Sequence, residues 1–341
     1  MRAVADARTQ LARVCGEPLE AAEFSAAVAA ALGRTMSFDG WCLLGLDPLT
    51  GLRTFQLGGR GTERTAEMAR NEALMQDVNK YDELAHASSP VGWLSREHPQ
   101  GRTSFRLNEI LLPQGFHSEI RLALRDAGRM WGALVLFRED ASRPLGEEEA
   151  AAAGAVADLL VAAVREFPVR PIARRGQPPG PGLVALAPDD RILAVSGGAR
   201  AWLADLVPGG DDQTYASDVT RVVFDAAHAL RRLDPAASTT CIRTVSGHWL
   251  HVEATRLALG DADVAVLLQP ATTRQLLATM AACHRLTARE TQLLTLLVDG
   301  RSGKQMAREL ALSPLTVNGH LRSVYRKCGV RGHDELLGRL A

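Results

Sequence analysis

The pattern of hydrophobic and polar positions divides the chain into three folded segments. A stretch with five prolines over 168–182 separates the first two, because proline removes backbone donors and favours an extended linker. A second boundary lies over 271–284, where a strand pattern ends at Pro270 and a connecting helix is expected. The expected domains are 1–167, 183–270 and 285–341.

The first segment has helical patterns at both ends and strand patterns between them. An alanine-rich apolar helix is predicted over 19–32, followed by two short strands around the turn at 47–51. A long polar helix is expected over 62–85, then two strands paired across 127–128, then a final helix over 144–166. This order is typical of an α+β domain with a largely antiparallel sheet.

The second segment repeats this order on a smaller scale. Two strands flank the turn at 188–190, and a short helix and a helix over 218–233 follow. Three further strand patterns complete the segment before Pro270. We therefore expect a second α+β domain, a small sheet with helices on one face.

The third segment contains the start signals of successive helices. Thr287 and Ser302 each precede a Glu or Gln by three residues, which is the pattern of a capping box. Ser313 before Pro314 predicts the N-terminus of another helix, expected over 314–328. This segment is expected to be all-α.

The helix over 314–328 has two unlike faces. Its apolar stripe is formed by Val317, Leu321, Val324 and Cys328. Its other side carries Gly319, Arg322, Ser323 and Arg326, with Thr316 and Asn318 at the flanks. Polar and cationic side chains beside a glycine that permits close approach suit insertion into a DNA major groove. On these residues alone, an ordinary amphipathic surface helix is the alternative.

Charge is unevenly distributed although the net charge is zero. Residues 285–341 contain ten basic and five acidic residues, so this segment carries +5 and the preceding residues −5. A cationic module on an anionic body is typical of nucleic-acid-binding proteins. Charged helices that are merely exposed to solvent can show the same excess of basic residues, so the charge alone does not establish nucleic-acid binding.

Several motifs of the third segment closely resemble the LuxR-type helix-turn-helix family. They are L-T-x-R-E at 286–290, K-Q-M-A-x-x-L at 304–310, S-P-x-T-V-x-x-H-L at 313–321 and K-x-G-V at 327–330. The resemblance implies a four-helix DNA-binding domain over 285–341 whose recognition helix holds Thr316 to Lys327. It implies that base edges are faced by Asn318, Gly319 and Arg322. It also implies that phosphates are contacted by Lys304, Ser313, Thr316 and Lys327.

Two departures from the family pattern bear on these contacts. Asn318 stands where the family usually has Lys or Arg, so base contacts are expected to rest more heavily on Arg322. Cys328 and Gly332-His333 replace the usual residues after the recognition helix.

The front segments resemble sensor domains of actinobacterial regulators that end in a LuxR-type tail. Residues 20–165 resemble a GAF-type domain, on S-P-V-G-W-L at 89–94 and M-W-G-A-L-V-L-F-R at 130–138. Residues 183–270 resemble a PAS-type domain, on 183–196 and G-H-W-L-H-V-E-A at 247–254. Domains of these types often bind small molecules or dimerise, and some only transmit a signal, so a small-molecule effector is a candidate but neither resemblance identifies it. Trp93 and Trp131 are candidate sensor-pocket residues, with core packing as their alternative role.

Catalytic and metal-binding signatures are missing from the sequence. It has no phosphate-binding glycine motif, no H-E-x-x-H and no nucleophile elbow, so no enzyme activity and no cofactor are expected. His248 and His251 are expected on opposite faces of a strand, and the five cysteines are scattered singly, which argues against a metal site. No apolar run is long enough to span a bilayer, so a cytoplasmic protein is expected.

The sequence therefore predicts a DNA-binding transcriptional regulator. We expect a homodimer that binds a roughly two-fold symmetric site on double-stranded DNA through the helix over 314–328, modulated by the front domains, with RNA polymerase as a candidate partner. The alternative is a small-molecule receptor or scaffold that acts through protein partners and carries a weak or vestigial DNA-binding tail. The departures at Asn318 and Gly332-His333 keep this alternative open.

Overall fold

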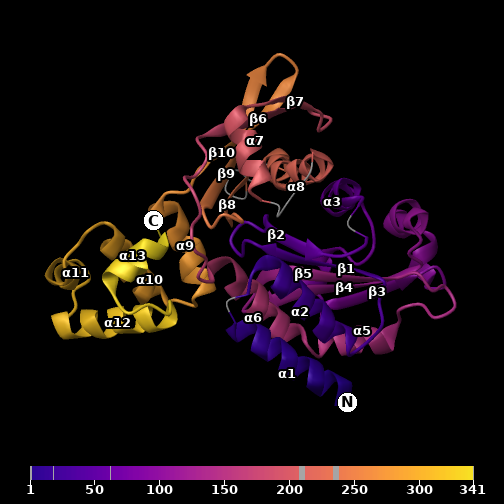
Figure 1. The fold of residues 1–341 in the computed structure, drawn as a ribbon, viewed down its shortest axis with the longest axis horizontal. Helices are drawn as coiled ribbons and strands as arrows, with labels where there is room; N and C mark the ends of the chain where they lie inside the picture. Colours follow the sequence, from indigo (N-terminus) through magenta and orange to yellow (C-terminus); the bar gives the residue numbers. More distant parts are fainter. Residues whose placement is uncertain (1, 18, 62, 207–211, 233–237, 341) are drawn as a thin grey trace.

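The computed structural model describes residues 2–17, 19–61, 63–206, 212–232 and 238–340. Figure 1 shows two α+β domains and a C-terminal helical domain. Each α+β domain is built on a five-stranded sheet in which all paired strands are antiparallel. The expected fold classes of the three segments are confirmed at this level. No described helix is long and apolar enough to cross a bilayer.

The first domain has the strand order β2-β1-β5-β4-β3. Its strands are β1 (Gly40–Leu46), β2 (Arg53–Gly58), β3 (Val91–Ser95), β4 (Ser118–Asp126) and β5 (Arg129–Arg138). Four helices cover one face of the sheet (Figure 1): α1 (Arg2–Gly16), α2 (Ala21–Gly33), α5 (Glu147–Gly154) and α6 (Ala157–Glu166). The other face meets α3 (Thr65–Leu74), α4 (Tyr81–His86) and the π-helical turn η2 (Arg106–Leu111). Short 3-10 turns lie at η1 (Pro99–Arg102), η3 (Leu112–Gln114) and η4 (Phe167–Val169).

The helix expected over 62–85 is two helices, α3 and α4, separated by a turn. The Asp77 carboxylate accepts hydrogen bonds from the Asn71 side chain at 2.8 Å and from the Arg106 backbone nitrogen at 2.7 Å. The Lys80 Nζ donates to the carbonyl oxygens of Asn71 and Met75, at 3.0 and 2.6 Å, and so satisfies the C-terminal end of α3. The sequence pattern predicts that the helix continues past residue 74, but the contacts of Asp77 and Lys80, one of them with the distant Arg106, end it there.

The helix expected over 144–166 is also divided, into α5 and α6. Arg8 of α1, a helix that the sequence analysis did not identify, donates to the Ala155 carbonyl oxygen at 2.7 Å. The same guanidinium pairs with Asp158 at 2.7 Å. The N-terminal helix thus contacts the chain where α5 gives way to α6.

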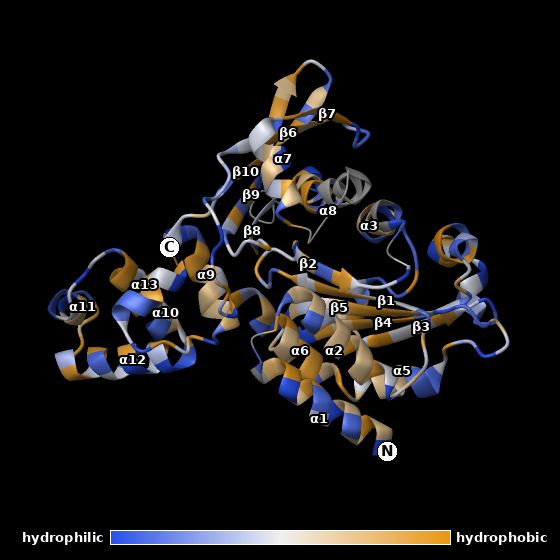
Figure 2. Ribbon diagram, in the orientation of Figure 1, coloured by the Kyte–Doolittle hydropathy of each residue, from blue (hydrophilic) through white to orange (hydrophobic). Residues whose placement is uncertain are grey.

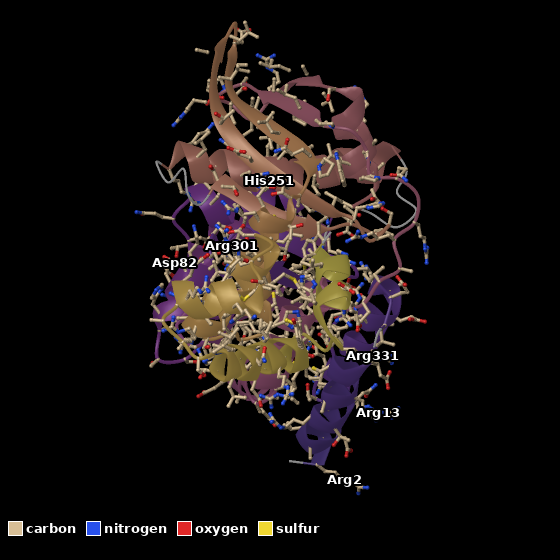
Figure 3. All side chains as sticks on the ribbon, turned by 90° about the vertical axis from the view of Figure 1, so that its left-hand side faces the viewer. Arg2, Arg13, Asp82, His251, Arg301 and Arg331 are labelled. Carbon is tan, nitrogen blue, oxygen red and sulfur yellow. The ribbon has the colours of Figure 1, made fainter. Side chains whose placement is uncertain are left out.

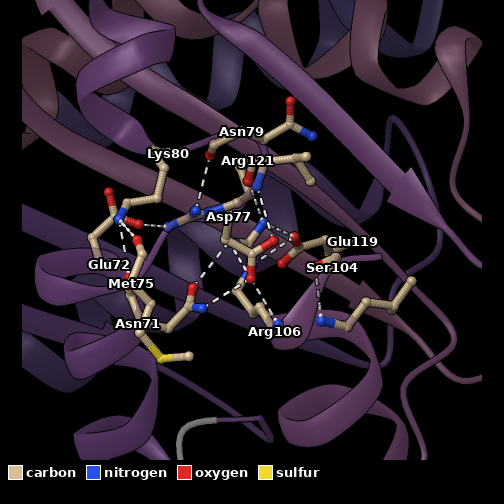
Figure 4. A network of polar contacts seen from close by, with 12 residues as sticks. Asn71, Glu72, Met75, Asp77, Asn79, Lys80, Ser104, Arg106, Glu119 and Arg121 are labelled. Atoms are coloured by element: carbon tan, nitrogen blue, oxygen red, sulfur yellow. Dashed lines mark hydrogen bonds and ion pairs between the residues drawn. The ribbon is translucent and has the colours of Figure 1, made fainter. Parts of the chain in front are cut away.

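Figure 4 shows a buried network of charged side chains that attaches the turn after α3 and η2 to the sheet. Arg106 and Glu119 are both fully buried, and their closest atoms, Nη2 and Oε1, are 2.6 Å apart. Arg121 donates to the Glu72 carboxylate at 2.7 Å. Buried pairs of this kind are costly to break, because one charge is left without a partner. The network fixes the position of this outer face of the sheet.

The second domain has the strand order β7-β6-β10-β9-β8, the same topology as the first domain. Its elements are β6 (Gly182–Leu186), β7 (Ile192–Val195), α7 (Gly197–Ala204), α8 (Asp212–Arg231), β8 (Thr239–Arg243), β9 (Trp249–Leu259) and β10 (Ala262–Pro270). The expected order of two strands, two helices and three strands is confirmed. The helix α8 begins at Asp212 rather than Asp218, and its expected end at Leu233 lies outside the described residues.

The described C-terminal helices are α9 (Thr273–Cys283), α10 (Ala288–Val298), α11 (Gly303–Glu309), α12 (Pro314–Lys327) and α13 (His333–Leu340). Of these, α10, α11 and α12 begin at the predicted caps. The capping boxes at Thr287 and Ser302 are both present, and the Ser313 hydroxyl accepts from the Thr316 backbone nitrogen at 3.1 Å. These predictions are confirmed.

One continuous hydrophobic core joins the first domain to the C-terminal domain. It runs from the helix-covered face of the first sheet through the buried side of α9, at Leu276 and Met280, to Leu293 and Val324. Figure 2 shows the hydrophobic residues concentrated on the strands of both sheets, with alternating hydrophilic and hydrophobic residues along α12. The second domain has its own core between its sheet and α7 and α8. The C-terminal domain is therefore seated on the rest of the chain through α9.

Candidate nucleic-acid interface

Helix α12 sits on the C-terminal core through the stripe predicted from the sequence. All four stripe residues are buried: Val317, Leu321, Val324 and Cys328. They belong to the same cluster as Leu293 and Leu294 of α10 and Met306 of α11. This packing fixes the rotation of α12, so its opposite face is turned to solvent.

The residues expected to face bases lie on that exposed side. Asn318, Gly319 and Arg322 are all exposed, and neither polar side chain has a hydrogen bond or ion pair among the described residues. A Cβ at Gly319 would meet no heavy atom within 4 Å. Their unpaired polar groups are therefore accessible to an external partner.

Leu315 lies next to this face and was not singled out by the sequence analysis. Its side chain is 82% exposed, the highest exposure among the large hydrophobic residues described. The available signal was its place in the first turn of α12, directly after Pro314 and off the apolar stripe. An exposed apolar side chain here is suited to contact with a thymine methyl group.

Three of the residues expected to contact phosphates are exposed near the N-termini of α11 and α12. Lys304 is exposed in the first turn of α11. Ser313 caps α12, and its hydroxyl lies 2.8 Å from the Thr316 hydroxyl. The first backbone N–H groups of a helix and its dipole favour an anion at such a position.

Lys327, the fourth of these residues, is held inside the domain. Its Nζ lies 2.6 Å from the Glu290 carboxylate, and it donates to the Arg285 carbonyl oxygen at 3.0 Å. Burial raises the pKa of Glu290, but the hydrogen bonds from Lys327 and from the Thr287 backbone outweigh this effect and lower it to about 2. The placement favours a role in attaching α12 to α10 over the expected phosphate contact, because the ammonium already has two partners.

Further arginines surround this helix on the surface of the C-terminal domain. Figure 3 looks onto the domain and labels Arg301, between α10 and α11, and Arg331, between α12 and α13. Both side chains are exposed. Arg301 pairs with Glu309 at 3.3 Å, a contact that is open to solvent and so contributes little stability. Both arginines add to the positive field that attracts a polyanion.

The candidate sensor-pocket residues lie away from the two cavities described. Trp131 is 5% exposed in the core under the helices, and the partly buried Trp93 packs against the same cluster. A cavity of about 960 Å³ lies instead on the opposite face of the first sheet, between this face, α3, α4 and α8. The strand pleat turns Trp93 toward the helices and Cys42 toward the cavity. Trp131 is the extra residue where the register between β4 and β5 shifts, and this bulge turns it toward the helices although Ala133 and Val135 of the same strand line the cavity.

The large cavity combines apolar walls with charged groups from both α+β domains. Arg121 lies over the Tyr81 ring, with its central carbon 3.7 Å from the ring centroid, and both line the cavity. Burial raises the pKa of the Tyr81 hydroxyl. Asp225 and Arg232 of the second domain line the far wall. The volume is within the usual range for small-molecule pockets.

The histidines and cysteines have separate surroundings. His248 Nε2 lies 3.2 Å from the Arg175 carbonyl oxygen, and His251 Nε2 lies 3.4 Å from the Thr239 hydroxyl. All five cysteines are free, and four of them are buried. Within the described ranges, no three His, Cys, Asp or Glu side chains are grouped as metal ligands.

Comparison with known proteins assigns the C-terminal domain. Residues 284–338 match the family model described as "Bacterial regulatory proteins, luxR family", a non-enzymatic family, as expected from the sequence. No curated protein matches the chain. The crystal structure of Escherichia coli SdiA covers 98% of this chain and 94% of its own, at 12% identity and a TM-score of 0.29, a likeness too weak to indicate function. The C-terminal domain of this chain is a LuxR-family helix-turn-helix DNA-binding domain.

Proposed function

We propose that the whole chain is a transcriptional regulator that binds double-stranded DNA as a homodimer and is modulated by its first two domains. The observation that carries this proposal is α12, whose exposed Asn318 and Arg322 have no hydrogen-bond or ion-pair partner among the described residues while its opposite face is buried in the core. A two-fold symmetric dimer would bind two half-sites of a roughly palindromic operator. A bacterial regulator of this kind works in the cytoplasm, with RNA polymerase as a candidate partner.

Four residues of α12 are proposed to face the base edges, each in a different role. Arg322 has the fork geometry that recognises the O6 and N7 acceptors of guanine, and Asn318 has the amide that recognises adenine. Gly319 allows the helix backbone to approach the groove, because no side chain intervenes. Leu315 adds an apolar contact.

The proposed phosphate contacts are made by Lys304, Ser313 and Thr316. These contacts position the helix and carry no base information. Lys327 is proposed as a positioning residue, since its ammonium pairs with Glu290 and so attaches the recognition helix to α10.

We propose that residues 1–167 form a GAF-like and residues 183–270 a PAS-like sensor domain. Their shared strand order supports a common architecture. The cavity of about 960 Å³ is the proposed effector pocket, because it has a ligand-sized volume and is lined by both domains. A ligand there would contact α8 and the first sheet together.

Selection of bound sequences from random duplex DNA tests the proposal. The full-length chain at about 0.15 M salt should enrich a two-fold motif. Arg322→Ala should lose about 1 to 3 kcal/mol of discrimination at one base pair of each half-site, because a bidentate contact is removed. Arg70→Ala, an exposed arginine of α3, is the matched control and should leave the motif unchanged.

Two outcomes would contradict this assignment. A motif that keeps its sharpness in Arg322→Ala would remove Arg322 from the base contacts. Failure of the unmodified chain to bind any duplex even at low salt would favour the alternative, a receptor or scaffold acting through protein partners with a vestigial tail.

A further inference from the structure

A second, smaller cavity lies where the linker, the second domain and the DNA-binding domain meet. Its volume is about 400 Å³. Its walls come from the segment 169–174, from Arg243 and Trp249 at the facing ends of β8 and β9, from Met280 of α9, and from Gly338 and Arg339 of α13. Four parts of the chain that are separated in sequence thus line one cavity.

Four arginines line this cavity, and its lining contains no Asp or Glu. They are Arg170, Arg174, Arg243 and Arg339. Burial, followed by repulsion from the other three arginines, lowers the pKa of Arg243 to about 10. Burial likewise lowers the pKa of Arg170 to about 10, against a weaker opposite effect of Glu20. The positive charge of these four arginines is therefore not balanced by acidic side chains in the cavity lining.

The guanidinium groups have mainly backbone partners. Arg174 donates to the Gly338 carbonyl oxygen at 3.5 Å, and Arg243 donates to that of Ile172 at 3.4 Å. Within the described part of the chain, Arg339 alone of the four has a carboxylate within ion-pair distance, that of Glu335 at 3.3 Å. Arg170 donates to the Leu19 carbonyl oxygen and Arg339 to that of Cys328, both at 2.9 Å. Carbonyl oxygens carry no net charge, so most of the positive charge of the cluster is left without compensation.

Two buried donors at the cavity have no hydrogen-bond partner among the residues that the structure describes. They are the Nε1 of Trp249, a residue that is 5% exposed, and the Nε of Arg243. The Arg243 guanidinium lies over the Trp249 ring, with its central carbon 5.1 Å from the centroid. Buried donors without acceptors are costly, and an acceptor in the cavity would relieve that cost.

We propose that this cavity binds a small organic anion. The guanidinium groups of Arg243 and Arg174 would hold its phosphate or carboxylate group, because a guanidinium presents donors that match the oxygens of either. Its apolar part would lie against Ile172, Met280 and the Trp249 ring. The volume admits a small metabolite and lies at the lower end of the usual range for ligand pockets.

An occupant of this cavity would contact the second domain and α13 at the same time. Its binding energy would then favour the arrangement in which the DNA-binding domain lies against the second domain, and DNA affinity would change with occupancy. The ligand site itself does not depend on the proposed DNA contacts, because none of its lining residues belongs to α12.

Calorimetric titration of the full-length chain without DNA tests the site. The probes are adenosine 5′-monophosphate and benzoate, with adenosine and benzyl alcohol as their uncharged counterparts and inorganic pyrophosphate as the bare anion. At least one organic anion should bind at a single site about tenfold or more tightly than its uncharged counterpart. Stronger binding of the monophosphate or of benzoate would identify the anionic group, and stronger binding of pyrophosphate than of either would overturn the organic part of the proposal.

Arg243→Gln and Arg174→Gln should each weaken this binding about tenfold. Arg200→Gln is the matched control, because Arg200 is an exposed arginine of α7 outside the cavity. Without ligand, Arg243→Gln should not lower the melting temperature, since it removes a repelled charge, whereas a purely structural role would lower it. The proposal is overturned if no anion binds more tightly than its uncharged counterpart, or if Arg200→Gln weakens binding equally.

Discussion

The ion pair of Glu290 and Lys327 shows how single residues of the DNA-binding domain combine two duties. Glu290 accepts from the Thr287 backbone nitrogen at 2.7 Å and so completes the capping box of α10. The same carboxylate pairs with Lys327 at the far end of α12. One buried carboxylate thus fixes the start of one helix and the end of the recognition helix.

Glu290→Gln should lower stability in a pH-dependent manner. The folded chain lowers the pKa of Glu290 from 4.5 to about 2, so the ionised carboxylate stabilises the fold above about pH 5 and this contribution is lost as the pH falls toward 2. The variant should lose about 3 kcal/mol of unfolding free energy at pH 7 and less than half of that at about pH 3. Urea denaturation at both pH values measures this difference.

A matched control for that experiment is Glu309→Gln on α11. The Glu309 side chain is 42% exposed and pairs with Arg301 at the surface, so the variant should differ little from the unmodified chain at either pH. An equal loss for Glu290→Gln at both pH values would contradict the assigned role of its ionised form.

Residue roles were predictable from sequence where the determinant is local. Caps such as Ser302 with Gln305 depend on residues three apart, and the apolar stripe of α12 depends on helical spacing. The partners of Lys327 and the surroundings of Trp131 were not predictable, because both depend on which elements meet in space. The four arginines around the smaller cavity come from three parts of the chain, the linker with Arg170 and Arg174, the end of β8 and α13, so no local pattern predicts that they meet.

At the scale of the element, α12 contains a glycine that local preference disfavours. Gly319 is exposed in the middle of the helix, where glycine costs about 0.5 to 1 kcal/mol relative to alanine. A Cβ there would meet nothing within the chain. The residue is therefore better explained by what lies outside the chain than by packing.

Gly319→Ala should raise stability and weaken DNA binding together. We expect a gain of about 0.5 to 1 kcal/mol in unfolding free energy, because alanine restricts the unfolded chain and favours the helix. We also expect lower affinity for the selected operator, because the methyl group would occupy the approach to the base edges. Urea denaturation and DNA titration measure the two effects.

The control is Gly33→Ala at the end of α2, where an added Cβ also meets nothing within 4 Å. It should leave operator affinity unchanged. Unaltered affinity in Gly319→Ala as well would mean that this part of α12 does not approach the groove.

Element boundaries were predictable where the sequence contains its own stop signals. The helices α10 to α12 begin at their Thr and Ser caps. The division of the helix expected over 62–85 was not predictable, because the turn depends on Asp77 meeting Arg106 across the fold. Helix α1 was missed because its partners, such as Asp158, lie at the other end of the domain.

At the scale of the whole molecule, the DNA-binding domain is joined to the first domain by charge as well as by apolar contact. Asp126 at the end of β4 pairs with Arg285, and lies 3.5 Å from Arg165 of α6. Arg285 has a φ of 51°, a left-handed conformation that sets the direction in which the chain leaves α9. The sequence predicted three separate domains; that two of them share a core follows only from the structure.

Asp126→Asn should loosen this connection without unfolding either domain. The Asp126–Arg285 pair is exposed, and the buried Arg165 keeps the Glu166 carboxylate at 3.7 Å, so the expected effect is local, a faster amide hydrogen exchange in residues 284–287 by less than about tenfold. Asp82→Asn, at an exposed aspartate of α4 paired with His86, is the control and should not change exchange there. Unchanged exchange in Asp126→Asn would show that apolar contacts alone hold the domain.

The shared core limits how this regulator could be recombined with others. If the chain were cut at residue 285, Leu276, Leu277 and Met280 of α9 would be exposed on the N-terminal fragment. The C-terminal fragment would lose the contacts that these side chains make in the shared core. A chimera that is to remain monodisperse should therefore exchange α9 together with the surface that receives it. The segment that has to be exchanged as one piece is therefore larger than the helix-turn-helix alone, because it includes α9.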